Sequence, residues 1–165
     1  MRLVIPPEDP DLDGVATAFA YAEYLKKNDH KAVAAVFGSP DEETEELFDE
    51  IGEEVSDASY YLYSADEITL VSASSMENVS QRIHQEKVTE LIDHAADALS
   101  DFTEAEQEID ENFSTAAGIV AEKYRDTDTE ISREAATVLH HAITSAGEVT
   151  QRDQEIADWL QDQLE

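Results

Sequence analysis

Two strand-like segments of this chain end in side chains of the kind that bind divalent cations. The apolar N-terminal segment precedes Asp11 and Asp13, two carboxylates spaced i, i+2 immediately before a helical pattern. A second segment, residues 88–92, is followed directly by Asp93 and His94. Carboxylate and imidazole groups suit manganese, magnesium or zinc. Because open parallel sheets bind ligands at the carboxyl ends of their strands, these four residues predict half of a dinuclear metal site.

The same residues also have an ordinary structural interpretation. Asp11 and Asp13 lie in Asp-Pro and Asp-Gly contexts, which are typical of turns and helix starts. His94 at a strand end can be satisfied by local hydrogen bonds instead of a metal. From the residues alone, the aspartates could bind a metal or cap a helix. His94 could likewise be a metal ligand or a side chain satisfied by local hydrogen bonds.

These candidates need a scaffold, and the sequence predicts one in which strands and helices alternate. Such alternation is typical of a parallel sheet flanked by helices. We therefore expect an α/β fold with a doubly wound, mostly parallel sheet of about five strands and a helical C-terminal third. Strands are predicted at 3–5, 32–37, 67–73 and 87–92, with a further short strand or its approach near the tyrosines at 60, 61 and 63; helices are predicted at 15–27, 42–51, 78–85, 115–124, 133–145 and 151–164.

The expected C-terminal helices begin at recognisable capping residues. Ser114, Ser132 and Thr150 each precede a helical segment, and hydroxyl side chains at such positions accept hydrogen bonds from free backbone amides. Asp153 stands three residues after Thr150, which approximates a capping box with aspartate in place of glutamate. No repeat or domain boundary is evident, so residues 1–165 are predicted to form a single domain.

Charge is the most unusual property of the composition. Forty acidic residues against ten basic ones give a formal charge of −30, while 41% of residues are hydrophobic. That apolar content supports a folded core and argues against a disordered acidic chain. An acidic surface of this kind repels phosphate backbones and anionic lipids, so nucleic acid and membrane partners are not expected. High salt screens the repulsion between these acidic groups. We therefore expect the protein in the cytoplasm of a salt-accumulating halophile.

Two absences in the sequence agree with a cytoplasmic location. The chain has no cysteine, which excludes disulfides and thiolate chemistry within it. No segment has the pattern of a signal peptide or a membrane span.

Three motifs, taken in order, resemble the DHH phosphoesterase superfamily. They are Asp9-Pro10-Asp11-Leu12-Asp13-Gly14, then Leu91-Ile92-Asp93-His94, then Ser114-Thr115 leading into Ile119-Val120-Ala121-Glu122-Lys123-Tyr124. The segment from Phe113 to Leu160 is most similar to manganese-dependent family II inorganic pyrophosphatases. The resemblance covers nearly the whole chain but only the N-terminal domain of that family, so the domain that closes over the substrate is expected to be missing.

The resemblance implies a two-metal hydrolase, but several of the family's ligand positions hold other residues here. Its aspartate pair falls on Asp11 and Asp13, and its Asp-His-His falls on Asp93, His94 and Ala95. Asp11, Asp13 and His94 are thus the implied remaining metal ligands, with Asp93 as a supporting partner. The other ligand positions fall near Pro7, Ser72, Ala73 and Ala146. Three ligands are too few for two metal ions. We therefore expect this site to bind one Mn²⁺ or Mg²⁺ ion, or no metal ion.

Two functions follow as expectations. The first is a degenerate phosphoesterase or pyrophosphatase-like protein, non-catalytic or weakly active, that acts as a binding or assembly module. The alternative is an active manganese-dependent phosphohydrolase whose site is rebuilt from Glu8 or Asp9, which flank the lost histidine position, or is completed by another subunit. A homodimer and a small phosphate-containing ligand are the expected partners.

Overall fold

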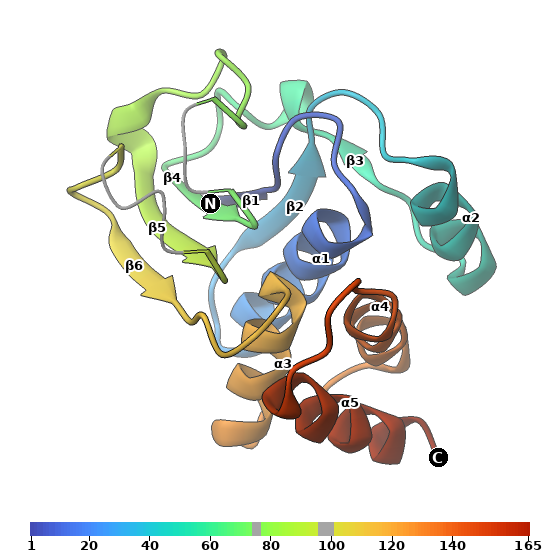
Figure 1. Cartoon of the computed structure of the whole chain (residues 1–165). Helices are drawn as coiled ribbons and strands as arrows, with labels where there is room; N and C mark the ends of the chain where they lie inside the picture. The colour runs from blue at the N-terminus through green and yellow to red at the C-terminus, as the bar shows by residue number, and fades with distance from the viewer. Residues whose placement is uncertain (74–76, 96–100) are drawn as a thin grey trace.

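The computed structural model describes residues 1–73, 77–95 and 101–165. These residues form a six-stranded sheet in the order β3-β2-β1-β4-β5-β6, and every strand pair in it is parallel (Figure 1). The expected α/β class is confirmed, with one strand more than predicted. The strands are β1 (Arg2–Ile5), β2 (Ala32–Val36), β3 (Ser56–Asp57), β4 (Glu67–Val71), β5 (Val88–Asp93) and β6 (Glu106–Ile109).

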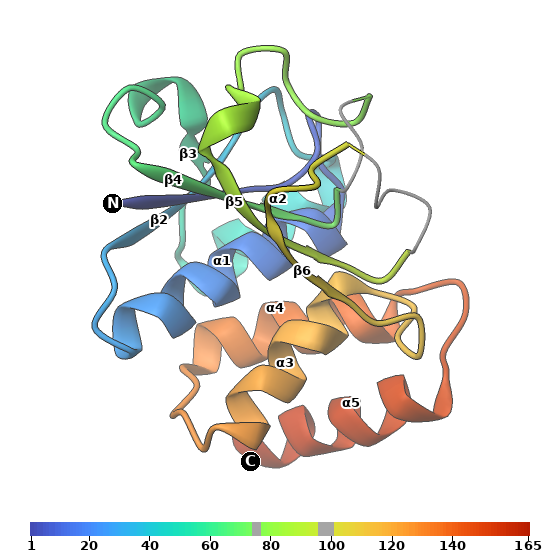
Figure 2. The ribbon, with the colours of Figure 1, turned by 90° about the vertical axis from the view of Figure 1, so that its left-hand side faces the viewer.

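The α-helices gather on one side of this sheet (Figure 2). Helix α1 contacts β1, β2 and β4, whereas α3 contacts β5 and α5 packs on α3 and α4. The predicted helical C-terminal third is therefore present and covers α1. The helices are α1 (Leu12–Lys27), α2 (Glu42–Ile51), α3 (Ala116–Asp126), α4 (Arg133–Thr144) and α5 (Gln151–Leu164). No helix in the described part of the chain combines the length and the apolar character needed to cross a bilayer.

Strand side chains alternate between two hydrophobic cores, as the pleat requires. Val4, Val36, Val71 and Ile92 point towards α1 and join the larger core between the sheet and the helices. Their neighbours along the strands, among them Leu3 and Leu91, join a second core on the opposite face. Both faces are buried, which explains why the central strands are continuous apolar runs.

The second core is covered by irregular chain and short 3-10 turns instead of long helices. Residues 58–65 contribute Ala58, Leu62 and Ala65, and residues 77–87 contribute Val79 and Ile83. Two sequence predictions fail here. The helix expected at 78–85 is a series of turns that ends in η2 (Gln85–Lys87), and the tyrosine-rich segment forms η1 (Ala58–Tyr60) and a turn instead of a strand.

The C-terminal helix starts agree with the sequence at two of three positions. Ser132 caps α4, and Thr150 with Asp153 forms the expected capping box of α5. At α3 the cap is Thr115, which accepts from the Gly118 amide, and the prediction for Ser114 was wrong. Ser114 instead donates its hydroxyl to Asp153 at 2.6 Å, so it connects the start of α3 to α5.

Candidate functional site

A cleft of about 350 Å³ opens at the carboxyl edge of the sheet. Its walls come from the residues that follow β1, β2, β4 and β5, together with the start of α3 and the end of α4. The strand order reverses between β1 and β4, and open α/β sheets bind their ligands in the crevice at such a reversal. The cleft is therefore the position where this fold would place a ligand.

The cleft brings together three of the four site residues predicted from sequence. Asp11, Asp13 and His94 all line it, and Ser72 and Ala146 line it too. Asp93 is buried beside His94. The structure therefore places these strand-end residues together at one edge of the sheet.

Asp13 is held by hydrogen bonds from its own chain. Its carboxylate accepts the Ala117 amide at 2.9 Å and the Ala116 amide at 3.1 Å, both from the first turn of α3. The Ser72 hydroxyl donates at 3.0 Å and the Thr17 hydroxyl at 3.3 Å. Backbone amides at a helix N-terminus stabilise anions, and the anion at the start of α3 is the Asp13 carboxylate. Asp13 thus links α1 to the end of β4 and to α3.

The electrostatics of Asp13 are dominated by its enclosure. Burial raises the pKa of the Asp13 carboxyl group, and the neighbouring charge of Asp11 raises it further. The Ala117 and Ala116 amides and the Ser72 hydroxyl lower the pKa, but the net shift is upward. The surroundings of this carboxylate are therefore neutral hydrogen-bond donors instead of a compensating positive charge.

Asp11 has the structural role that was left open in the sequence. It is the N-cap of α1, and its side chain accepts from the Gly14 amide at 3.0 Å. The side chain is exposed at the cleft mouth. Capping uses Oδ1, which leaves the other oxygen directed to no partner among the described residues.

His94 lies half-buried on the far side of the cleft. Its Nδ1 is 3.3 Å from Asp93 Oδ1, although this contact lacks the alignment of a hydrogen bond. The Asp93 carboxylate raises the pKa of His94, burial opposes it, and the charges of Asp13 and Asp153 raise it again. Asp93 therefore favours the protonated imidazolium.

This environment gives a pH prediction for His94. An NMR titration in potassium chloride should place its imidazole midpoint above the usual 6.5, and Asp93→Asn should move the midpoint down. The stabilisation from this pair is complete below pH about 6.5 and is lost as pH rises through the raised pKa of His94. A midpoint at or below 6.5, or one that Asp93→Asn leaves unchanged, would contradict the pairing.

Two carboxylates of the cleft were missed in the sequence. Asp41 and Glu43 lie at the start of α2, after the short connection that follows the carboxyl end of β2. Asp41 caps α2 through the Thr44 amide at 3.0 Å, and Glu43 Oε1 lies 3.6 Å from His141 Nε2. The rule that pointed to Asp11 and His94 applies equally to β2, so the signal was present.

The two proposed substitute ligands lie elsewhere. Glu8 and Asp9 are exposed and are not among the residues that line the cleft. Asp9 has a positive φ of 50°, and its Oδ1 accepts from the Ser39 amide at 3.0 Å. It approaches Gly38 so closely that a Cβ there would clash with it. Asp9 therefore fastens the loop after β1 to the loop after β2.

The cleft does not fit the paired metal ions that the resemblance implies. Within residues 1–73, 77–95 and 101–165, no group of three or more His, Asp or Glu side chains is arranged to hold a metal ion. The four donors on Asp13 occupy the oxygens that a metal would need. The described residues thus do not fit a dinuclear centre, and a single ion at Asp11, Asp13 and His94 stays a prediction.

The fold and the cleft together define a parallel α/β protein with a ligand crevice at the reversal point of its sheet. Within this class, the chain is similar to a protein of Methanococcus jannaschii assigned to the family II inorganic pyrophosphatases, with a TM-score of 0.81 and 22% identity over 99% of this chain and 56% of that one. It is also similar to an exopolyphosphatase-related protein from Bacteroides fragilis, with a TM-score of 0.78 and 12% identity over 98% of this chain and 52% of that one.

These likenesses confirm, at the level of the fold, the resemblance to pyrophosphatases and DHH-type proteins seen in the sequence. The chain spans about half the length of these two solved structures. No family model matches the sequence, and no curated protein matches it either.

Proposed function

We propose that this chain is a degenerate DHH-type protein that keeps the phosphoesterase fold but is no longer an efficient hydrolase. It acts as a binding or assembly module. A fold can persist after the chemistry once carried on it has been lost. The acidic composition supports a further part of the proposal, which places the protein in the cytoplasm of a salt-accumulating organism.

The observation that carries this proposal is the saturation of Asp13. In the resemblance, this carboxylate is a metal ligand and the position near Ser72 holds another. Here Ser72 is a hydroxyl donor to Asp13 at 3.0 Å, and α3 supplies two amide donors. The protein's own neutral donors therefore hydrogen-bond the carboxylate oxygens that would bind a cation in a working two-metal site.

Phosphate release from pyrophosphate tests the proposal. In potassium chloride, with the protein shown to be folded by circular dichroism, we expect no release with Mn²⁺ beyond that of Mn²⁺ alone. A panel of phosphodiesters should give the same result. Turnover that needs Mn²⁺ and is abolished by Asp13→Asn, with Lys31→Gln as a control away from the cleft, would overturn the proposal.

Residual metal binding is measured separately from turnover. Calorimetry with Mn²⁺ or Mg²⁺ in the same buffer reports whether one ion still binds at Asp11, Asp13 and His94. Asp11→Ala should weaken any such binding, because both Asp13 oxygens accept hydrogen bonds, whereas the cap uses only Oδ1 of Asp11. No heat of binding would restrict the module to metal-free ligands.

An active manganese-dependent phosphohydrolase is the second candidate. The carboxylates of Asp41 and Glu43 line the cleft and favour it, since they offer oxygen ligands that a rebuilt site could recruit. No Lys or Arg is among the described residues that line the cleft, so positive groups that bind the phosphate would come from another chain that closes over it. In that case, Glu43→Gln would remove turnover, whereas the degenerate protein has no turnover to lose.

A further inference from the structure

The donors around Asp13 are divided evenly between its two carboxylate oxygens. Oδ1 accepts the Ala117 amide at 2.9 Å and the Thr17 hydroxyl at 3.3 Å. Oδ2 accepts the Ala116 amide at 3.1 Å and the Ser72 hydroxyl at 3.0 Å. Each oxygen thus receives one backbone amide and one hydroxyl, which suits a planar group with two acceptor oxygens. We call these four donors the carboxylate cradle.

The carboxylate cradle is assembled from three parts of the fold. Ala116 and Ala117 begin α3, Thr17 belongs to α1, and Ser72 follows β4. Thr17 is fully buried. Ser72 has a φ of 56°, a backbone conformation that favours glycine. A serine at this position supplies a hydroxyl donor that a glycine would lack, so the cradle is more than the first turn of one helix.

The carboxylate cradle also lies at the positive end of the α3 dipole, where a negative group is stabilised. The Gly118 amide bonds to the Thr115 hydroxyl at 3.2 Å, which leaves the Ala116 and Ala117 amides for Asp13. Amides in this position bind carboxylate, sulfate and phosphate groups in proteins. The donors are all neutral, so they hold an anion by hydrogen bonds and the helix dipole and not by a paired cation.

The cleft gives access to the carboxylate cradle. Asp13, Ser72 and Thr115 all line this cleft of about 350 Å³, and Asp13 and Ser72 keep some exposure to solvent. An anion that entered the cleft would therefore reach the four donors if the Asp13 side chain were absent. Asp13 fills, from within the chain, a place that an external anion could otherwise take.

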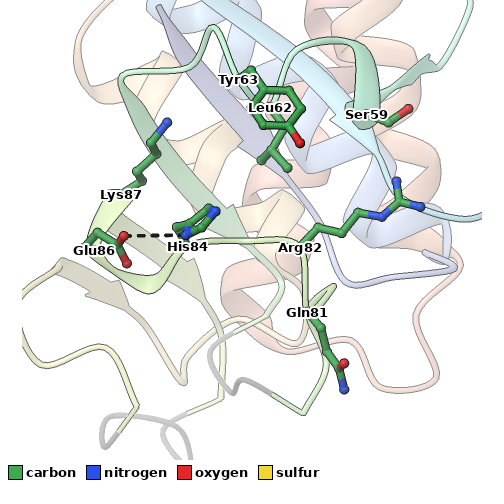
Figure 3. Close-up of a pocket in the computed structure, with 8 residues that line it drawn as sticks. All are labelled: Ser59, Leu62, Tyr63, Gln81, Arg82, His84, Glu86 and Lys87. Atoms are coloured by element: carbon green, nitrogen blue, oxygen red, sulfur yellow. Dashed lines mark ion pairs between the residues drawn. The ribbon is translucent and has the colours of Figure 1, made fainter.

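The residues that line the larger cavity of the protein, of about 590 Å³, are not arranged in this way. That cavity contains Arg82 and Lys87, which lie at its opposite ends and point apart (Figure 3). Glu86 lines the cavity too. Its cations therefore do not converge on one anion, whereas the four donors of the carboxylate cradle do.

We propose that the carboxylate cradle is an oxyanion site that Asp13 occupies as an internal ligand. The contact is autoinhibitory, because an external anion cannot use the α3 amides while Asp13 is in place. The matching ligand is a small monoanion with two coplanar oxygens, which is the chemistry of a carboxylate. The inference rests on the part of the proposed function that has the chain's own donors, and no metal, on Asp13. Its test measures stability and needs no turnover, so the two proposals can fail separately.

Rescue of Asp13→Ala by formate tests the carboxylate cradle, because formate replaces the carboxylate that this substitution removes. Thermal unfolding is followed by circular dichroism while potassium formate replaces potassium chloride at constant ionic strength. Formate should raise the Tm of Asp13→Ala with saturation. At about ten times its Kd it should lower the unfolding equilibrium constant about elevenfold. The unmodified protein, whose cradle is filled, should show no saturable shift.

Asp13→Asn and Asp11→Ala are the matched controls. Asparagine keeps the carboxylate cradle filled, and Asp11 has one amide donor, from Gly14, so formate should rescue neither variant with saturation. Adding Ser72→Gly to Asp13→Ala removes one donor to the anion and should weaken formate about fivefold or more.

Three results would overturn the proposal. The first is a response of Asp13→Ala to formate that is no larger than that of the controls. The second is inorganic phosphate that rescues Asp13→Ala more strongly than formate, because the donors would then not be matched to a carboxylate. If Asp13→Ala is unfolded in chloride, the same titration measures the fraction that refolds, and the third result is that formate refolds none of it.

Discussion

Asp13→Ala is expected to lower the free energy of unfolding by about 3 kcal/mol, because several donors lose their acceptor at once. The Ala116 and Ala117 amides and the Ser72 hydroxyl would be left facing an enclosed gap. The first turn of α3 would also lose a negative group at its positive end. Denaturant unfolding in potassium chloride, followed by circular dichroism, measures the loss.

The sign of this effect separates the two functional proposals. Carboxylates collected for a cation repel one another when the cation is absent, so removing one from a working site often stabilises the metal-free protein. Asp11→Ala is the control, since it removes a single exposed cap and should cost only about 1 kcal/mol. A metal-free Asp13→Ala protein that is as stable as the original, or more so, would contradict the structural role of Asp13.

Transfer from molar to low salt is expected to unfold most of the protein. The formal charge is −30, and at about 0.1 M salt the screening length of about 10 Å lets neighbouring carboxylates repel one another. At about 1 M it falls to about 3 Å. Circular dichroism across a potassium chloride series measures the fraction folded and gives a salt midpoint.

Charge variants on exposed helix positions test the cause of that midpoint. Replacing Glu45, Glu46 and Glu50 of α2 with glutamine removes three negative charges from exposed side chains and should move the midpoint to lower salt. Gln161→Glu on α5 adds one exposed charge and should move it the other way. If the fraction folded is the same at the lowest and the highest potassium chloride concentrations, the halophile interpretation is wrong.

The strands that sequence analysis located are those with a strong apolar signal. Each central strand is buried on both faces and therefore apolar. The edge strands gave no such signal, because β6 reads Glu106-Gln107-Glu108-Ile109 and β3 has only Ser56-Asp57. The tyrosines at 60 and 63 have the residue type of a strand, yet they are 83% and 94% exposed. Tertiary context outweighed propensity there.

Some features of the candidate site can be predicted from neighbouring residues, whereas others depend on residues far apart in the sequence. A strand followed by carboxylates is a local pattern, and it placed Asp11, Asp13 and His94 at one cleft. The donors to Asp13 are not local, since Ala116 and Ala117 stand more than 100 residues further along the chain. No sequence pattern near Asp13 indicates that the first turn of α3 contacts its carboxylate. Whether Asp13 is a ligand or a structural anchor was therefore open from sequence.

The unequal covering of the two sheet faces has a consequence for how this protein can change over evolution. Helices on the α1 side pack on one another, so a substitution there disturbs several elements. The opposite face is covered by turns and loops, which accept insertions and replacements at low cost. New specificities can accumulate on that side while the layer that determines the fold stays constant.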